Sequence, residues 1–266
     1  MPLPPVESLA PLLPWLLLPL TQLAAAWSKG QVVRALGWWG VPLTTGWIGV
    51  PVHELSHVLA ARLLGRKVVR VRWFAPDAET GNLGSVEWQP GSGPLAWLAM
   101  LTVGFAPLLG GALVLRAMLH GASWAVGLPL PGPPASADWL AWRQAVLALA
   151  DWAKLATLAV WRRPDPLAWS AVAAWWAMAS VAAHLTPSSA DLRGAWRGGL
   201  AVAVAMTLAV AGCELADIRW QDLAMRTAVG LGWLVAPGLL VAIPAGLAVG
   251  SGATVLGWVR KAGPAR

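Results

Sequence analysis

Long apolar stretches without Asp, Glu, Lys or Arg alternate along this chain with short polar segments. A helix that crosses a membrane needs roughly 20 predominantly apolar residues, and most of the stretches reach or approach that length. The last stretch contains Pro237 and Pro244 and is too long for one untilted helix, so a tilted, broken or re-entrant helix is expected there. The stretches cover residues 8–28, 35–52, 88–115, 166–190, 198–213 and 227–259.

Residues 66–90 interrupt this pattern with a charged segment in which apolar and polar residues alternate. Alternation is typical of a β-strand, and the Gly-Asn-Leu-Gly sequence at 81–84 is typical of a turn. The segment therefore predicts a small β-hairpin outside the hydrocarbon core. One face of its first strand is expected to carry Val69, Val71 and Trp73, and the other Arg70, Arg72 and Phe74.

Two further segments break the apolar pattern. Residues 121–137 are rich in Gly, Pro and Ser and predict a loop. Residues 138–161 have a helical pattern, but Arg143, Asp151 and Lys154 fall near one face of that helix. This helix is expected either to lie in the membrane interface or to span the membrane with its polar face toward the bundle.

The composition narrows the class of protein. Of the 266 residues, 58% are hydrophobic and only 12% are charged, and the mean hydropathy is +0.62. Soluble domains are about 45–50% apolar and about 25% charged, so a soluble enzyme, a disordered tail and a coiled coil are excluded. The expected fold is an all-α polytopic membrane protein. Residues 1–266 would form one domain, a bundle of about six transmembrane helices with a small cytoplasmic hairpin.

The net charge of +7 bears on the expected partners, and the single cysteine bears on disulfide bonds. In a membrane protein, Arg and Lys are expected in loops that face anionic lipid head groups, so the expected partner is the lipid bilayer and not nucleic acid. Cys213 is the single cysteine, which excludes an internal disulfide. The oligomeric state does not follow from these features.

The second apolar stretch runs into His53-Glu54-Leu55-Ser56-His57, which matches the pattern H-E-x-x-H. Residues four apart on a helix are rotated by about 40°, so both imidazoles can face one metal ion. Glu54 lies beside them, placed to act as the catalytic base that takes a proton from water. Zinc is the usual metal for such a pair, here one ion per chain. The alternative is a polar patch that packs two helices through ordinary hydrogen bonds.

A catalytic zinc needs a third protein ligand, and few candidates lie among apolar segments. Asp191 follows Pro187, which breaks the boundary between two apolar stretches and can direct the carboxylate back into the bundle. The other interpretation of Asp191 is an N-cap of a helix that begins at Leu192. His184 could be a ligand, a transition-state donor or a residue that orients a ligand.

The motif HELSH in an apolar helix, a hairpin soon after it and a distant Pro-x-x-x-Asp segment resemble the site-2 protease family of intramembrane zinc metalloproteases. The resemblance implies a zinc ion held by His53, His57 and Asp191, with Glu54 as the base. It also implies hydrolysis of peptide bonds in transmembrane proteins or peptides, with a strand near the site that pairs with the unwound substrate. Residues 68–74 would supply that strand. Its side chains would be Val69, Val71 and Trp73.

The second motif departs from the family pattern N-x-x-P-x-x-x-L-D-G. Here HLTPSSADLRG has His184 in place of Asn, one residue fewer between Pro187 and Asp191, and Leu192 after the aspartate. No PDZ insertion is expected in 266 residues. The chain therefore resembles a divergent, minimal branch. The alternative function is a non-catalytic membrane scaffold or a transporter with a structural metal or ion site.

A cluster of basic residues follows the motif closely. The positive-inside rule places such a cluster in the cytoplasm, so the metal site is expected near the cytoplasmic face of a prokaryotic cytoplasmic membrane. Asp191 reaches the same depth if the helix over 138–161 lies in the opposite interface, and we favour that topology. The cluster consists of Arg62, Arg66, Lys67, Arg70 and Arg72.

Overall fold

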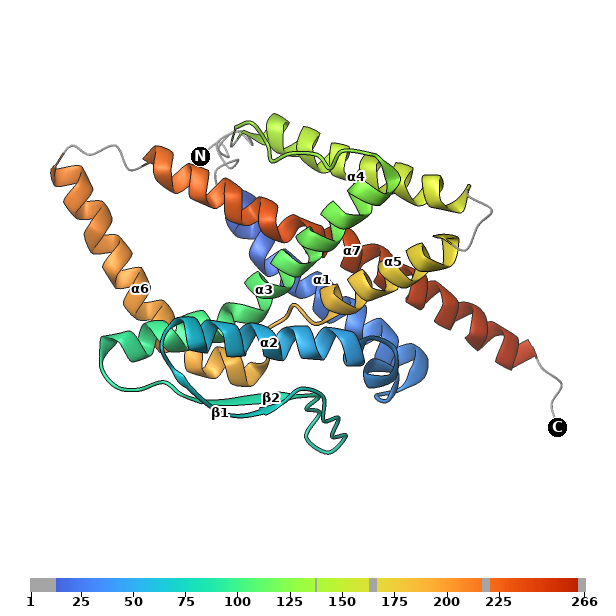
Figure 1. Ribbon diagram of the computed structural model, residues 1–266, viewed down its shortest axis with the longest axis horizontal. Helices are drawn as coiled ribbons and strands as arrows, with labels where there is room; N and C mark the ends of the chain where they lie inside the picture. Colours follow the sequence, from blue (N-terminus) through green and yellow to red (C-terminus); the bar gives the residue numbers. More distant parts are fainter. Residues whose placement is uncertain (1–12, 137, 163–166, 217–220, 263–266) are drawn as a thin grey trace, which may run out of the picture.

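The computed structural model describes residues 13–136, 138–162, 167–216 and 221–262. Within these ranges it shows seven α-helices and one two-stranded antiparallel sheet, which lies against one side of the helical bundle (Figure 1). A short π-helical turn, Pro42–Gly46, precedes the second helix. The helices are α1 (Leu13–Leu36), α2 (Trp47–Leu63), α3 (Pro94–Val126), α4 (Trp139–Trp161), α5 (Leu167–Ala183), α6 (Ser189–Leu215) and α7 (Gln221–Ala262).

Three helices, α3, α6 and α7, are long and apolar enough to cross a membrane. α5 contains a shorter apolar segment, Trp169–Ala183. The helical architecture agrees with the predicted membrane bundle, whereas the number of about six spans stays a prediction. Residues 8–12 of the first apolar stretch lie outside the described residues.

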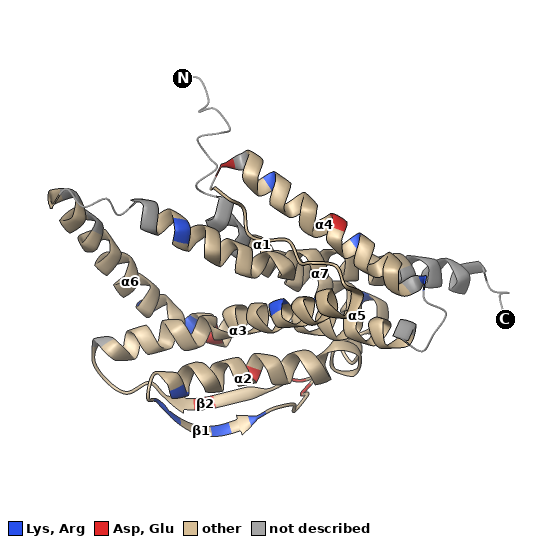
Figure 2. Ribbon diagram, turned by 45° about the horizontal axis from the view of Figure 1, so that its top comes forward, with Lys and Arg blue, Asp and Glu red and all other residues tan. Residues whose placement is uncertain are grey.

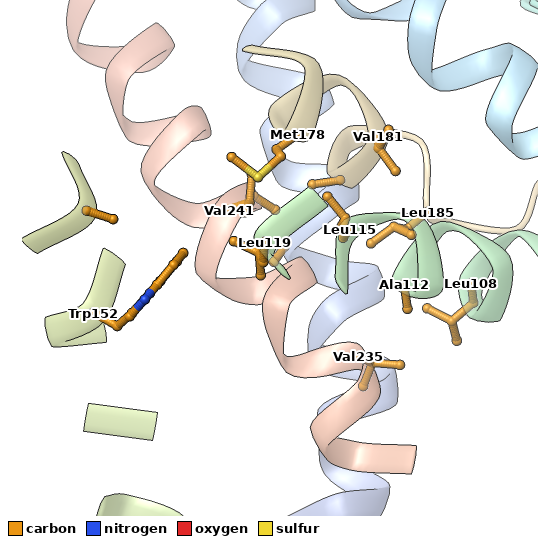
Figure 3. Close-up of a cluster of buried hydrophobic side chains, with 14 residues drawn as sticks. Leu108, Ala112, Leu115, Leu119, Trp152, Met178, Val181, Leu185, Val235 and Val241 are labelled. Atoms are coloured by element: carbon orange, nitrogen blue, oxygen red, sulfur yellow. The ribbon is translucent and has the colours of Figure 1, made fainter. Parts of the chain in front are cut away.

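The centre of the bundle is formed by α3, which packs against α5 and α7 (Figure 3). Leu108, Ala112, Leu115 and Leu119 follow one another at intervals of four, three and four residues, so they lie on one face of α3. Between apolar helices, such packing stabilises mainly through van der Waals contact. The same buried cluster includes Trp152 of α4, Met178 and Val181 of α5, Leu185, and Val235 and Val241 of α7.

α3 and α6 approach closely because each has a glycine where they cross. A Cβ atom on Gly198 of α6 would lie 2.0 Å from the Trp97 carbonyl oxygen of α3. A Cβ atom on Gly104 of α3 would lie 2.8 Å from the Asp191 carbonyl oxygen of α6. Small residues allow the backbones of apolar helices to approach in this way. The crossing holds the first turns of α6, including Asp191, against α3.

The predicted hairpin is confirmed by β1 (Lys67–Arg72) and β2 (Ser85–Gln89), which pair antiparallel. The loop between them is ordered by Asp77, whose carboxylate accepts hydrogen bonds from the Thr80 hydroxyl at 2.7 Å and the Glu79 amide at 2.9 Å. These two hydrogen bonds hold the pKa of the exposed Asp77 carboxyl below its ordinary value.

A β-bulge changes the faces that were expected for the first strand. The register shifts between Val68 and Arg70, so that Val69 is 55% exposed while Val68 and Val71 are half-buried. The prediction that Val69, Val71 and Trp73 share one face is therefore wrong. The extra residue of a bulge reverses the side to which its neighbours point, and alternation in the sequence does not reveal it.

One predicted loop is shortened, and one alternative for the last apolar stretch, a broken helix, is excluded. Residues 121–126 continue α3 instead of forming a loop, and the helix ends at Gly127, which caps it with a left-handed conformation at φ 69°. The loop therefore begins only at Leu128. In α7, Pro237 and Pro244 lie inside one continuous helix. A bundle can tolerate such prolines because neighbouring groups compensate for the missing backbone hydrogen bonds.

Residues 138–161 form α4 and its cap, as the helical pattern indicates. Asp138 caps the helix by accepting a hydrogen bond from the Ala141 amide at 2.8 Å. Trp142 and Leu149 of α4 pack with Trp233 of α7. α4 and the hairpin lie on opposite sides of the bundle in both views (Figures 1 and 2). The interfacial position of α4 stays a prediction.

The outer surface of the helices is largely apolar. Leu63, Leu113, Leu200 and Leu208 are each more than half exposed. Basic residues gather along β1, whereas most of the helical surface carries no charge (Figure 2). Such a surface is typical of helices that contact lipid or another apolar partner.

The glycine crossing of α3 and α6 generates a prediction. Gly198→Ala is expected to destabilise the protein by about 1–3 kcal/mol, because its new methyl group meets the α3 backbone. Gly194→Ala, on the same helix with open space around it, is expected to be neutral or slightly stabilising. The midpoints of denaturant unfolding in detergent compare the two variants. Equal midpoints would contradict the close crossing.

Candidate metal centre

The H-E-x-x-H motif lies on α2, as predicted. His53 and His57 are one helical turn apart, and their ring centroids are 4.9 Å from each other. The Nε2 atoms of the two rings are separated by only 3.2 Å. Helical spacing therefore brings both imidazoles to one point, although it does not by itself decide how the rings are turned.

Two backbone carbonyl groups on other segments fix the orientation of the rings. His53 Nδ1 lies 2.8 Å from the carbonyl oxygen of His184, just beyond the end of α5, and His57 Nδ1 lies 2.7 Å from that of Val103 in α3. A carbonyl oxygen only accepts hydrogen bonds, so each Nδ1 must carry the proton and donate it. In the neutral rings, both Nε2 atoms then offer lone pairs. Hydrogen bonds of this kind are common behind metal-bound histidines.

Asp191 completes the cluster from the first turn of α6. Its Oδ1 atom is 3.3 Å from His57 Nε2, and its Oδ2 atom is 3.6 Å from His53 Nε2. The same Oδ2 atom accepts a hydrogen bond of 2.6 Å from the amide of Ser188, whose Oγ accepts one of 3.2 Å from the Asp191 amide. The helix begins at Ser189, so the alternative of an N-cap for a helix that begins at Leu192 is wrong. Asp191 instead lies inside the first turn of α6. Its carboxylate caps the helix by accepting the Ser188 hydrogen bond, and it also faces the two histidines.

These three side chains form a group that could hold a metal ion. One ligand atom from each of His53, His57 and Asp191 can be chosen so that all lie within 4.8 Å of one another. Two ligands about 2.0–2.1 Å from a tetrahedral zinc ion are about 3.3 Å apart, which is close to the separations observed here. Three acceptors that face each other at this distance repel one another, and either a proton on one imidazole or a metal ion between them relieves the repulsion. The donor set and its spacing therefore fit zinc.

The His184 side chain lies outside this group. Its Nε2 atom is 3.2 Å from the Thr45 hydroxyl, and the ring is 5% exposed. Its backbone oxygen, by contrast, accepts the hydrogen bond from His53. Of the roles considered for His184, the structure supports the last: His184 orients a candidate ligand, His53, and it does so through its backbone oxygen.

Close packing at glycines holds α2 in place. A Cβ atom on Gly49 would lie 2.3 Å from the Ser180 carbonyl oxygen and 2.5 Å from the His184 ring. Two turns further along α2, a Cβ atom on Gly110 of α3 would lie 2.3 Å from Ser56 Oγ. These contacts allow the carbonyl groups of α3 and of the segment after α5 to reach the two imidazoles. Sequence reasoning missed these glycines, whose signal was their position inside apolar helices.

A cavity of about 310 Å³ opens beside the cluster. Glu54 lines it and is 5% exposed, and within the described part of the chain its carboxylate makes no hydrogen bond. The backbone at Gly84 closes over Glu54, because a Cβ atom there would lie 2.9 Å from Glu54 Oε1. The lining consists of Lys29, Val50, His53, Glu54, His57, residues 81–86, Trp88, His184, Thr186, Ser188, Ala190 and Asp191.

The hairpin contributes to this cavity through β2 and the loop before it. Val69, Val71 and Trp73, the residues predicted for the substrate strand, are not among the lining residues. Ser85, Val86 and the Trp88 ring of β2 are among them. Sequence reasoning did not identify these β2 residues or Lys29. The signal for Lys29 was a charged residue within a largely apolar helix, α1.

Comparison with known proteins found no relative: no family model, no curated protein and no solved structure matches this chain. The resemblance to the site-2 protease family therefore depends on the motifs of the sequence alone. The geometry of the site supplies independent support for a metal-binding group, but it carries no statement about family membership.

Zinc binding is the first prediction from this geometry. The wild-type chain is expected to bind one zinc ion, and His57→Ala to lose it, because the ion would keep only two protein ligands. Zinc should stabilise the wild-type protein by about 2.7 kcal/mol when free zinc is 100 times its Kd. Zinc content and thermal midpoints, with and without a chelator, measure both effects. His120→Ala is the control, since His120 is exposed on α3 outside the group. Equal zinc contents of wild type and His57→Ala would contradict the prediction.

The packing of α2 at Gly49 gives a second prediction. Gly49→Ala is expected to lower zinc affinity by about 10- to 100-fold, because its methyl group displaces the His184 segment that orients His53. Gly30→Ala adds the same methyl group to α1 where nothing lies within 4 Å, and it should leave the affinity unchanged. Competition titration against a chromogenic zinc chelator compares the two variants. If both variants keep the wild-type affinity for zinc, or if both lose affinity, Gly49 does not position the site.

Proposed function

We propose that this chain is an intramembrane zinc metalloprotease that hydrolyses peptide bonds of membrane-embedded proteins or peptides. The observation that carries the proposal is the convergence of His53 Nε2, His57 Nε2 and the Asp191 carboxylate beside a cavity that also contains Glu54. A metal site next to a carboxylate that has no hydrogen bond is the arrangement that hydrolysis of a peptide bond requires.

The candidate ligands have a catalytic rather than a closed arrangement. Catalytic zinc sites usually have three protein ligands, whereas structural sites have four. Here His53, His57 and Asp191 would hold the ion, and the His184 ring is directed to Thr45. The rival function, a scaffold or transporter with a closed structural site, would need a fourth ligand, and His184 was the residue expected to provide it.

Glu54 is the residue that would move the proton. When bound, zinc would supply a Lewis acid that acidifies water and polarises the scissile carbonyl group. The Glu54 carboxylate, at the cavity wall, would accept a proton from the attacking water and donate it to the amine nitrogen that leaves. Burial of Glu54 beneath Gly84 would keep bulk water away from the reacting groups.

The substrate would lie in extended form along β2. The backbone of a helix is already hydrogen-bonded and shielded, so a helical segment has to unwind before hydrolysis. In the described residues the sheet has two strands, and β2 therefore keeps one unpaired edge. Pairing of the substrate with that edge would satisfy its backbone groups and pass it along the cavity wall. This assignment replaces the earlier expectation for Val69, Val71 and Trp73.

The membrane setting belongs to the same proposal. α3, α6 and α7 would span a prokaryotic cytoplasmic membrane, with the basic residues of β1 on the cytoplasmic side. Because the hairpin covers Glu54, the reacting groups would lie near that face of the membrane. The charge-free outer surface of the helices would contact the lipid bilayer.

Substitution of Glu54 tests the proposed function. Glu54→Gln is expected to keep its zinc and to lower peptide hydrolysis by about 10²- to 10⁴-fold, because the amide cannot accept the proton from water. The assay is cleavage of a library of single-span membrane peptides in detergent, followed by mass spectrometry. Glu87→Gln, an exposed carboxylate on β2 outside the cavity, is the control and should cleave like wild type. Cleavage by Glu54→Gln at the wild-type rate, or no cleavage by wild type loaded with zinc, would overturn the proposal.

A further inference from the structure

Among the described residues that line the cavity beside the metal-binding group, Lys29 of α1 is the one lysine or arginine. It belongs to a helix that carries neither the H-E-x-x-H motif nor Asp191. α1 also carries Arg34 near its end, but Arg34 is exposed and does not line the cavity. The two cations of this helix therefore have different surroundings.

Protein surrounds most of the Lys29 side chain, and within the described part of the chain its ammonium group makes no hydrogen bond and no ion pair. A lysine near the end of a membrane helix normally extends to the lipid head groups. Lys29 instead points into a polar cavity, where an ammonium group with three donors is costly to leave without an acceptor.

Lys29 is not a member of the metal-binding group, but it shares the cavity wall with it. Its charge acts on the His184 ring, whereas the charged groups that act on Glu54 are His53, His57 and Asp191. His184 adjoins the metal-binding group, because its backbone oxygen accepts the hydrogen bond from His53. Lys29 would therefore contact a part of the substrate that neighbours the scissile bond.

The charges of the cavity determine the kind of group that Lys29 can bind. If a divalent ion occupies the metal-binding group, the carboxylates of Glu54 and Asp191 balance its charge. Lys29 is then the uncompensated charge among the described lining residues. An anionic group of the substrate would neutralise it, and ammonium–carboxylate hydrogen bonds are among the stronger ones in proteins.

We propose that Lys29 is a specificity-determining residue that binds the carboxylate of an Asp or Glu side chain of the substrate, close to the scissile bond. This inference rests on the proposed function and names its substrate class: membrane segments with an acidic residue near the point of hydrolysis. An acidic residue inside an apolar segment is uncommon, because it costs about 2.5–3.5 kcal/mol to insert, so it would mark few substrates.

Peptide binding tests this proposal separately from hydrolysis. The probes are peptides of one apolar sequence with a single Glu, or a single Gln, moved through successive positions. They are bound to the zinc-loaded Glu54→Gln protein in detergent, and fluorescence anisotropy gives the Kd. At one or two positions Glu should bind about 10- to 100-fold more tightly than Gln, the range expected for a hydrogen bond between charged groups.

Two variants of Lys29 and one control decide the outcome. Both variants are made in the same Glu54→Gln background. With Lys29→Met, the Kd values of the Glu and Gln peptides should differ by less than about threefold. With Lys29→Glu, a peptide that has Lys at the same position should bind more tightly than the Glu peptide. Arg34→Met removes a cation of the same helix outside the cavity and should keep the ratio. Zinc content shows that each variant keeps its site.

The results separate the two proposals. Three results would overturn the role of Lys29. The Glu and Gln peptides could bind equally at every position, neither could bind, or the preference for Glu could remain in Lys29→Met. Hydrolysis by the wild-type protein is measured independently. If wild type cleaves no peptide while binding still depends on Lys29, the proposed hydrolysis is wrong and recognition of the acidic group stands.

Discussion

The convergence of two imidazoles and one carboxylate at a single buried point is the physical constraint that the surrounding helices have to satisfy. Two imidazole Nε2 atoms lie 3.2 Å apart, and the Asp191 carboxylate lies 3.3–3.6 Å from them. Each ring is turned to this point by a hydrogen bond from Nδ1 to a backbone carbonyl oxygen, so neither can rotate away without losing that bond. A proton on one imidazole or a metal ion at the centre would relieve the repulsion between these acceptor atoms, and the spacing of the donor atoms fits zinc.

In this protein the packing of the helices determines the geometry of the site. The carbonyl groups that orient His53 and His57 belong to α3 and to the segment after α5, and they reach α2 because glycines remove side chains from the contacts. Gly104 does the same for the first turn of α6, which carries Asp191. Among apolar helices, small residues at crossings are the usual route to close approach. Four segments distant in sequence are thereby held at distances that a three-ligand site requires.

The local features of the site could be predicted from the sequence, and the contacts between segments could not. The spacing of His53 and His57 and the hairpin are local properties, so pattern and helical geometry were sufficient. The bulge at Val69 and the burial of β2 against the site depend on tertiary contacts, which alternation does not encode. The Gly- and Ser-containing end of α3 looked like a loop because composition does not show where a helix meets its cap at Gly127. The position of Lys29 in the cavity likewise depends on how α1 packs, and its local sequence does not reveal it.

The proposed function and the proposed role of Lys29 both require that His53, His57 and Asp191 hold one zinc ion. Zinc K-edge X-ray absorption of the purified protein, loaded with one equivalent of zinc in detergent, tests it most directly. Two imidazole nitrogens and at least one oxygen ligand are expected at about 2.0–2.2 Å from zinc, in a tetrahedral environment. A spectrum of zinc surrounded only by water, or one with a third imidazole and no protein oxygen, would contradict it.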